Sequence, residues 1–213
     1  MLRSVIIGAL AAAIASSAIV AQPATERSRP QRVRVEGPAI DNGCDAGAYS
    51  LVVSPDGTSL SVLFDDFVVN GGQDIGKRCA LTIPLNLPEG QSLGVYAVDY
   101  RGYAHLGQRE AGLFTVSYTT GRGGNPRGFR HPIRGAQDGE FNFTDQLRPG
   151  MLRRIGCGEA AKIDFNAVLA FRRAEASSEA MMALDSADGT RAPSGITFKF
   201  DLQPCRPGRG AGN

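Results

Sequence analysis

The chain has 213 residues, a formal net charge of +2, four cysteines and two histidines. This length suits one domain better than two, and the small net charge gives no sign of a nucleic-acid partner. The cysteines form no C-x-x-C pair, which argues against a structural zinc site with clustered ligands.

Residues 1–21 have the order of a secretory signal peptide. Arg3 supplies the charge, an uncharged apolar run extends from Val5 to Val20, and Ala21 closes it. We expect cleavage after Ala21, with Ala18 as the alternative. An uncleaved anchor is the competing interpretation, but a spanning helix needs roughly 20 strongly apolar residues, and this run is short and rich in alanine. The prediction is a secreted or periplasmic protein with no membrane span after cleavage.

Residues 22–43 are rich in Arg and Pro and poor in apolar side chains. We therefore expect a flexible leader there, followed by one domain over 44–205. Residues 206–213 are rich in Gly and are expected to form a flexible tail.

Within the domain, apolar residues alternate with polar ones at a period of two, which is typical of half-buried strands. The runs are Leu60–Phe64, Leu81–Leu87, Phe114–Tyr118, Phe141–Phe143, Ile163–Phe171 and Ile196–Leu202. No segment shows a helical stripe, and 174–184 is expected to be a short strand or one helical turn. The pattern predicts an all-β fold: a single antiparallel β-sandwich, jelly-roll-like, in which each sheet has one apolar face.

Turns are expected at three Asp-Gly steps, because the dipeptide suits the positive φ of tight hairpins. These steps are Asp56-Gly57, Asp138-Gly139 and Asp188-Gly189.

An even number of cysteines in an exported chain predicts disulfides, here two. Cys44 precedes the first strand, near 48–54, and Cys79 opens the third strand at the same end of the sheet. Cys157 precedes one of the last two long strands, and Cys205 ends the other. We predict the pairs Cys44–Cys79 and Cys157–Cys205.

Several short runs together have a recognisable pattern. They are Gly43-Cys44, Ser54-Pro55-Asp56-Gly57-Thr58, Phe64-Asp65-Asp66-Phe67, Arg78-Cys79, Val98–Tyr103, Cys157-Gly158 and Asp185–Thr190. The chain resembles in them the exported family called domain of unknown function 4360, over about 43–205. The resemblance implies an exported protein with no established activity, so it carries over no site residues. The segment 121–135 is longer and richer in Arg than is usual in that family.

Asp65 and Asp66 are the most suggestive acidic pair. Adjacent strand residues point to opposite faces, so without a bulge the two cannot face one substrate like the carboxylates of a glycosidase. Another arrangement places Asp65 opposite Asp99 on a neighbouring strand, with Arg101 and Tyr103 nearby. Such a patch would bind a sugar or Ca²⁺. The alternative is a buried Asp–Arg pair, or hydrogen bonds that fix the register of the strands.

The segment 121–134 contains four arginines and no acid: Arg122, Arg127, Arg130 and Arg134. As a loop it would hold an anionic glycan, a lipid headgroup or a nucleic-acid backbone. The alternative is a solvated insertion between two strands.

Motifs for nucleotide use are missing from the sequence, which has no Walker loop and no dinucleotide fingerprint. Neither His105 nor His131 is expected to belong to a hydrolytic triad. We expect no cofactor, no metal and no nucleotide. The leading hypothesis is a non-enzymatic β-sandwich that recognises an extracellular or surface component, such as a glycan or another anionic group. The alternatives are a structural cell-surface protein and an extracellular polysaccharide hydrolase or lyase that uses Asp65, Asp66, Asp99 and Tyr103.

Overall fold

The computed structural model describes residues 32–45, 47, 49–172, 177, 179–184 and 195–205. The expected signal peptide, the C-terminal tail and the Asp188-Gly189 turn lie outside these residues. Every regular element in the described part is a strand, so no helix there is long and apolar enough to cross a membrane.

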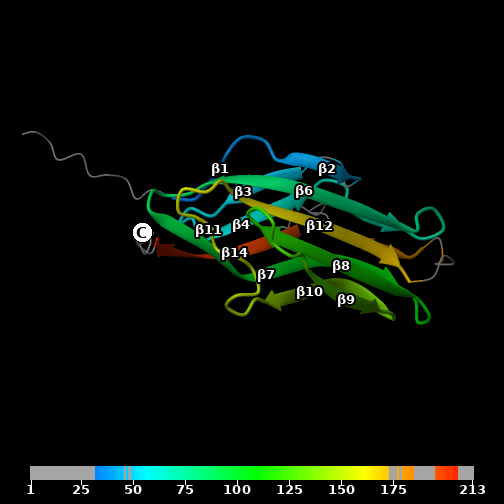
Figure 1. Ribbon diagram of the computed structural model, residues 1–213. Coiled ribbons are helices and arrows are strands. Elements are labelled where there is room, and N and C mark those ends of the chain that lie inside the picture. Colours follow the sequence, from blue (N-terminus) through cyan, green and yellow to red (C-terminus); the bar gives the residue numbers. More distant parts are fainter. Residues whose placement is uncertain are drawn as a thin grey trace, which may run out of the picture.

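The strands form two antiparallel sheets. Sheet A contains β1 (Arg34–Val35), β2 (Ile40–Cys44), β6 (Gly76–Asn86), β8 (Ala111–Thr120), β9 (Arg127–Arg134) and β12 (Ala161–Phe171). Sheet B contains β3 (Tyr49–Val53), β4 (Ser59–Phe64), β5 (Val68–Asn70), β7 (Gln91–Leu106), β10 (Gln137–Gln146), β11 (Ile155–Gly156), β13 (Met181–Ala183) and β14 (Gly195–Pro204). Figure 1 shows the sheets as two layers, with β6, β12 and β8 crossing in front of β14. The predicted antiparallel β-sandwich is confirmed.

The order of strands puts the long strands in the centre of each sheet. Sheet A runs β1-β6-β12-β8-β9, with β2 also paired to β6. Sheet B runs β3-β4-β14-β7-β13-β5, and β10 and β11 also pair with β7. The 16-residue strand β7 therefore connects most of sheet B, while β9 lies at the edge of sheet A.

The core lies between the layers and follows the predicted alternation. In β4, Leu60, Val62 and Phe64 are buried and their neighbours are partly exposed. In β12, every second residue from Ala161 to Phe171 is buried. The removal of these apolar side chains from water is the main force that holds the two sheets together.

Two disulfides connect the ends of strands. Cys44 of β2 is joined to Cys79 of β6, and Cys157 to Cys205 after β14. These are the pairs expected from the order of the strands. Each closes a loop of several tens of residues, which constrains the unfolded chain.

The expected leader ends earlier than residue 43. Residues 34–35 and 40–43 belong to strands of sheet A, and Val33 is only 1% exposed. The Arg32-Val33-Arg34-Val35 alternation has the strand period, and this period decides the structure despite the many arginines. Residues 22–31 lie outside the described residues.

Of the three Asp-Gly steps, Asp56-Gly57 forms the expected turn between β3 and β4, and Gly57 has a φ of 73°. The prediction of a turn at Asp138-Gly139 is wrong, because both residues lie inside β10 and pair with His105 and Ala104 of β7. The expected short strand within 174–184 is β13.

The segment 121–134 is not one long loop. Residues 127–134 form β9, which pairs with β8 along its whole length. Phe129, His131 and Ile133 point toward the core and alternate with exposed residues, so a strand period is present under the arginine-rich composition.

Candidate functional site

The outer side of sheet B carries a row of polar side chains along β7. Asp99, Arg101 and Tyr103 alternate with the buried Val98, Tyr100 and Ala104, so they point away from the core. Neighbouring strands extend the row. We call this surface the polar face, and its residues are Ser61, Tyr96, Asp99, Arg101, Tyr103, His105, Asp138, Glu140, Asn142, Thr144, Thr197 and Lys199.

Asp99 is held from two sides. Thr144 of β10 donates a hydrogen bond to Oδ1 at 2.7 Å, and Nζ of Lys199 lies 2.6 Å from Oδ2. Partial burial acts to raise the pKa of Asp99, but the hydrogen bonds from Lys199 and Thr144 outweigh it and lower this pKa. Asp99 is therefore a fixed, ionised acceptor.

Arg101 and Tyr103 are fixed by cross-strand contacts to β10. Nε of Arg101 donates to Asn142 at 3.0 Å, and the Tyr103 hydroxyl donates to Asp138. Nδ1 of His105 lies 3.2 Å from the same Asp138 oxygen. The hydrogen bonds from Tyr103 and His105 lower the pKa of Asp138.

Tyr96 stands out on this face because a β-bulge exposes it. Lys199 pairs with Ala97 and Phe200 with Val95, so Tyr96 has no register partner in β14. Its side chain is 46% exposed. The hydrogen bond to Asp99 raises the pKa of Lys199, and the nearby Tyr96 adds to this rise. The Tyr96 hydroxyl therefore lies close enough to Lys199 to affect it electrostatically.

The suggested arrangement with Asp65 opposite Asp99 is wrong. The register partners of Asp99 are Thr144 and Thr197, and β14 lies between β4 and β7. Two strand spacings, about 10 Å, therefore separate the lines of β4 and β7.

Asp65 and Asp66 follow the end of β4. Phe64 and Phe67 on either side are buried and meet edge to face with their centroids 5.0 Å apart. Asp66 forms an ion pair with Lys77 at 3.0 Å. The Phe-Asp-Asp-Phe run therefore anchors two rings in the core and leaves its acids outside.

The four predicted arginines do not converge. Arg122 lies in the segment between β8 and β9, and Arg130 and Arg134 are exposed on the outward side of β9. Arg127 instead lines a cavity of about 390 Å³, which we call the arginine cavity. Its lining residues are Thr120, Gly124, Asn125, Arg127, Gly150, Met151, Leu152, Arg153 and Arg154.

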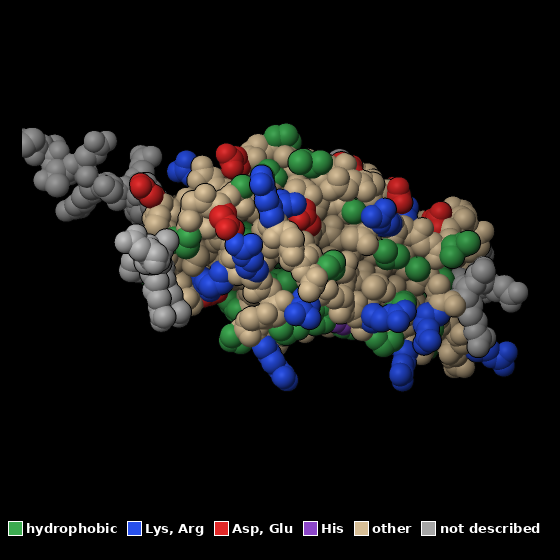
Figure 2. Space-filling model, in the orientation of Figure 1, with side chains coloured by type: hydrophobic (Ala, Val, Ile, Leu, Met, Phe, Trp, Pro, Cys, Tyr) green, Lys and Arg blue, Asp and Glu red, His purple; other side chains and the backbone are tan. Residues whose placement is uncertain are grey.

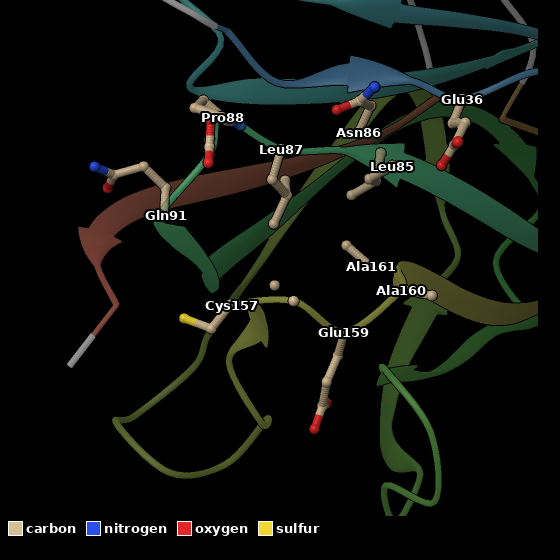
Figure 3. A pocket seen from close by; sticks show the side chains of 14 residues that line it. Glu36, Leu85, Asn86, Leu87, Pro88, Gln91, Cys157, Glu159, Ala160 and Ala161 are labelled. Carbon is tan, nitrogen blue, oxygen red and sulfur yellow. The ribbon is translucent and has the colours of Figure 1, made fainter. Parts of the chain in front are cut away.

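A second cavity, of about 290 Å³, lies near the Cys157–Cys205 disulfide, and we call it the glutamate cavity. Figure 3 shows Leu85 and Leu87 on one side of it and the Cys157–Ala161 segment on the other. Glu159 points away from the two leucines in this view. No group of three or more His, Cys, Asp or Glu residues in the described part of the chain could hold a metal ion.

A buried polar cluster was missed by the sequence analysis. The hydroxyls of Tyr100 and Tyr118 donate to Oδ2 of Asp145 at 2.7 and 3.3 Å. Burial raises the pKa of both tyrosines, so these hydroxyls stay protonated. Asp145 is 5% exposed, and Nε2 of His131 lies 3.2 Å from its Oδ1. The His131 ring stacks on Phe143 with centroids 4.6 Å apart.

A signal for this cluster exists in the sequence. Phe141, Phe143 and Asp145 have the same strand period, and so do Phe129, His131 and Ile133. The period puts each set on one side of its strand. It does not reveal that the edge strands of the two sheets, β9 and β10, lie against each other.

The fold and the disulfides define an exported, antiparallel β-sandwich protein, either secreted or periplasmic. The chain belongs to the family described as Domain of unknown function (DUF4360), whose family model matches residues 32–205.

A relative is an uncharacterized secreted protein of Arthroderma benhamiae, 25% identical over 169 residues, which cover 75% of this chain and 67% of that protein.

Two similar solved structures are carbohydrate-binding modules. The module TmCBM61, in complex with β-1,4-galactotriose, has a TM-score of 0.34 and 14% identity over 78% of this chain and 88% of its own. The mannan-recognising module TmCBM27 has a TM-score of 0.32 and 6% identity, and the match covers 80% of this chain and 98% of that module. At TM-scores this low, neither similarity carries an argument about this chain.

Proposed function

We propose that the protein is a non-catalytic binding protein that recognises a glycan of an extracellular or cell-surface polymer on its polar face. The observation that carries the proposal is a fixed array of donors and acceptors on the polar face. Tyr96 and Tyr103 lie on the same strand, β7, as Asp99 and Arg101. Asp99, Arg101 and Tyr103 are held by cross-strand contacts, so little side-chain freedom is lost when a ligand binds.

The chemistry of the array suits a sugar. Sugar hydroxyls need both donors and acceptors, and Arg101, Asn142 and Asp99 offer both kinds. The apolar side of a sugar ring can pack on an exposed aromatic ring such as that of Tyr96, which is amphipathic and has few rotatable bonds. An aromatic ring exposed to this extent is not explained by packing of the core.

The enzyme alternative has less support. A glycosidase needs two carboxyl groups on either side of the scissile bond, about 5–9.5 Å apart. Asp65 and Asp66 are separated from Asp99 by β14. Both oxygens of Asp99 are already engaged by Thr144 and Lys199, which favours a role as a fixed acceptor.

The test uses the mature full-length chain on a glycan array, followed by calorimetry with the best neutral oligosaccharide. Tyr96→Ala should weaken binding at least about 10-fold, since burial of an aromatic side chain contributes about 1.5–3 kcal/mol. The control is Ile40→Ala, which removes a side chain of 59% exposure from sheet A. Equal affinity of the wild type and Tyr96→Ala for that oligosaccharide would overturn the proposal.

A further inference from the structure

The arginine cavity has a charge pattern that the polar face does not explain. None of its lining residues belongs to that face, and none is acidic. Its volume lies within the range of about 300–1,000 Å³ that is common for small-molecule sites. In the lower part of Figure 2, toward β8 and β9 in Figure 1, Lys and Arg side chains predominate and Asp and Glu are sparse.

Arg154 fixes one wall of the cavity. Its guanidinium donates to both carboxylate oxygens and the carbonyl of Asp201, and to the hydroxyl and carbonyl of Ser92. A guanidinium has five N–H donors, and these five contacts occupy all of them. Arg154 therefore holds its segment against β7 and β14, and its charge is matched by Asp201.

Arg127 is in the opposite situation. Its Nε donates to the carbonyl of Met151 at 2.9 Å, which aims the side chain across the cavity. It has no acidic partner among the residues that the structure describes. Within the described part of the chain, Arg127 makes no hydrogen bond through its Nη groups, so their four N–H donors and the positive charge are available there. A planar guanidinium in this state suits a carboxylate or a sulfate, each of which accepts two parallel hydrogen bonds.

The remaining walls suit a ring that carries the anionic group. Met151 and Leu152 supply apolar surface, and Asn125 supplies an amide donor and acceptor. A bare ion would not fill about 390 Å³. Arg122 and Arg148 lie on the two segments beside the cavity, and neither has an ion-pair partner in the described ranges. They add positive potential without matching acids.

We propose that the arginine cavity is a second binding site, which takes an acidic sugar unit through its carboxylate or sulfate group, with Arg127 as the group that pairs with the anion. The site is independent of the glycan recognition proposed for the polar face. The test of one proposed site can give a negative result without affecting the proposal for the other site.

The test is calorimetry of the mature full-length chain at low salt with four probes. These are a galacturonic acid trimer, its uncharged methyl ester, a sulfated galactose trimer and a short DNA duplex. At least one of the two acidic trimers should bind about 10-fold more tightly than the methyl ester, and the stronger one identifies the anionic group. The proposal is overturned if the methyl ester binds as well as both acids, or if the duplex binds more tightly than they do.

The matched variants are Arg127→Gln and Arg130→Gln. They remove the same charge from the same strand, but Arg130 is exposed on the outward side of β9 and does not line the cavity. Arg127→Gln should weaken binding of the acidic trimer about 10-fold or more, and Arg130→Gln less than about twofold. Equal losses would indicate a diffuse electrostatic attraction and would contradict the proposal.

Two further variants keep the test decisive. Arg127→Gln also removes the hydrogen bond to Met151, so Asn125→Ala, which leaves that bond in place, should weaken binding a few-fold. Tyr96→Ala should leave the affinity for the acidic trimer unchanged, because Tyr96 lies on the polar face. If Asn125→Ala and Arg127→Gln both bind the acidic trimer as tightly as the wild type does, the arginine cavity is not the binding site.

Discussion

Nη2 of Arg153 lies 2.8 and 2.6 Å from the two carboxylate oxygens of Glu159. Arg153 lines the arginine cavity and Glu159 lines the glutamate cavity, so this ion pair joins the walls of two cavities of opposite character. Both side chains are more than half exposed, at 52% and 58%. The pair is therefore screened by solvent and adds little to stability, but it cancels one positive charge beside Arg127.

Removal of Glu159 should strengthen anion binding. In Glu159→Gln the charge of Arg153 is no longer matched, so the affinity for the acidic trimer should rise by up to about fivefold, the range of a surface ion pair. Calorimetry at low salt measures the affinity of the wild type and of Glu159→Gln for the acidic trimer. Glu36→Gln is the control, since Glu36 also lines the glutamate cavity but forms no ion pair among the described residues. A rise of the same size in the control would mean that net charge alone is responsible.

Tyr100 should contribute more to stability than Tyr118. Its hydroxyl donates to the buried Asp145 at 2.7 Å, whereas that of Tyr118 donates at 3.3 Å. Tyr100→Phe should lower the free energy of unfolding by about 1.5–3 kcal/mol, the range for a hydrogen bond to a charged group, and Tyr118→Phe by less. Urea unfolding with intact disulfides measures both. Equal losses would show that the two bonds are equivalent.

The Asp99–Lys199 pair should make a small, pH-dependent contribution to stability. The pKa of Asp99 is lowered from 3.8, so its contribution is present above that value and is lost as the pH falls through the folded pKa. The pKa of Lys199 is raised from 10.5, so its contribution is present below that value and is lost as the pH rises through the folded pKa. The pair therefore stabilises the fold between about pH 4 and pH 10.

Lys199→Met tests this window. Both side chains are at least one third exposed, so the loss near pH 7 should be less than about 1 kcal/mol and should disappear near pH 2. The pKa of Asp99, followed by NMR of its carboxyl carbon, should rise, because burial remains and Lys199 no longer opposes it. Lys199→Arg keeps the charge and should restore most of the stability. A loss that is the same at pH 2 and pH 7 would mean that packing, not charge, is involved.

The fold could be predicted from local patterns in most places. Leu60, Val62 and Phe64 alternate because one side of β4 meets the core, and such a period can be read without knowledge of the partner strands. The disulfide pairs followed from which strand ends lie together. Residues 127–134 were misassigned because Arg and Gly dominate their composition, although His131 and its neighbours keep the strand period.

The candidate site could be predicted only in part. Asp99, Arg101 and Tyr103 share a face because they alternate along one strand. Tyr96 could not be found, because its exposure depends on a bulge in the pairing of β7 with β14. Asp65 was placed opposite Asp99 because the sequence does not show that β14 lies between their strands.

The sequence by itself determined which side chains enter the core and which remain in water, because a strand alternates its side chains whatever its neighbours are. Only the tertiary structure decided which strands are adjacent and which distant residues meet. Tyr100, Tyr118 and Asp145 come together across two sheets, and Arg127 reaches the carbonyl of Met151 between separate segments. Such contacts depend on the packing of the whole domain, and no local pattern encodes them.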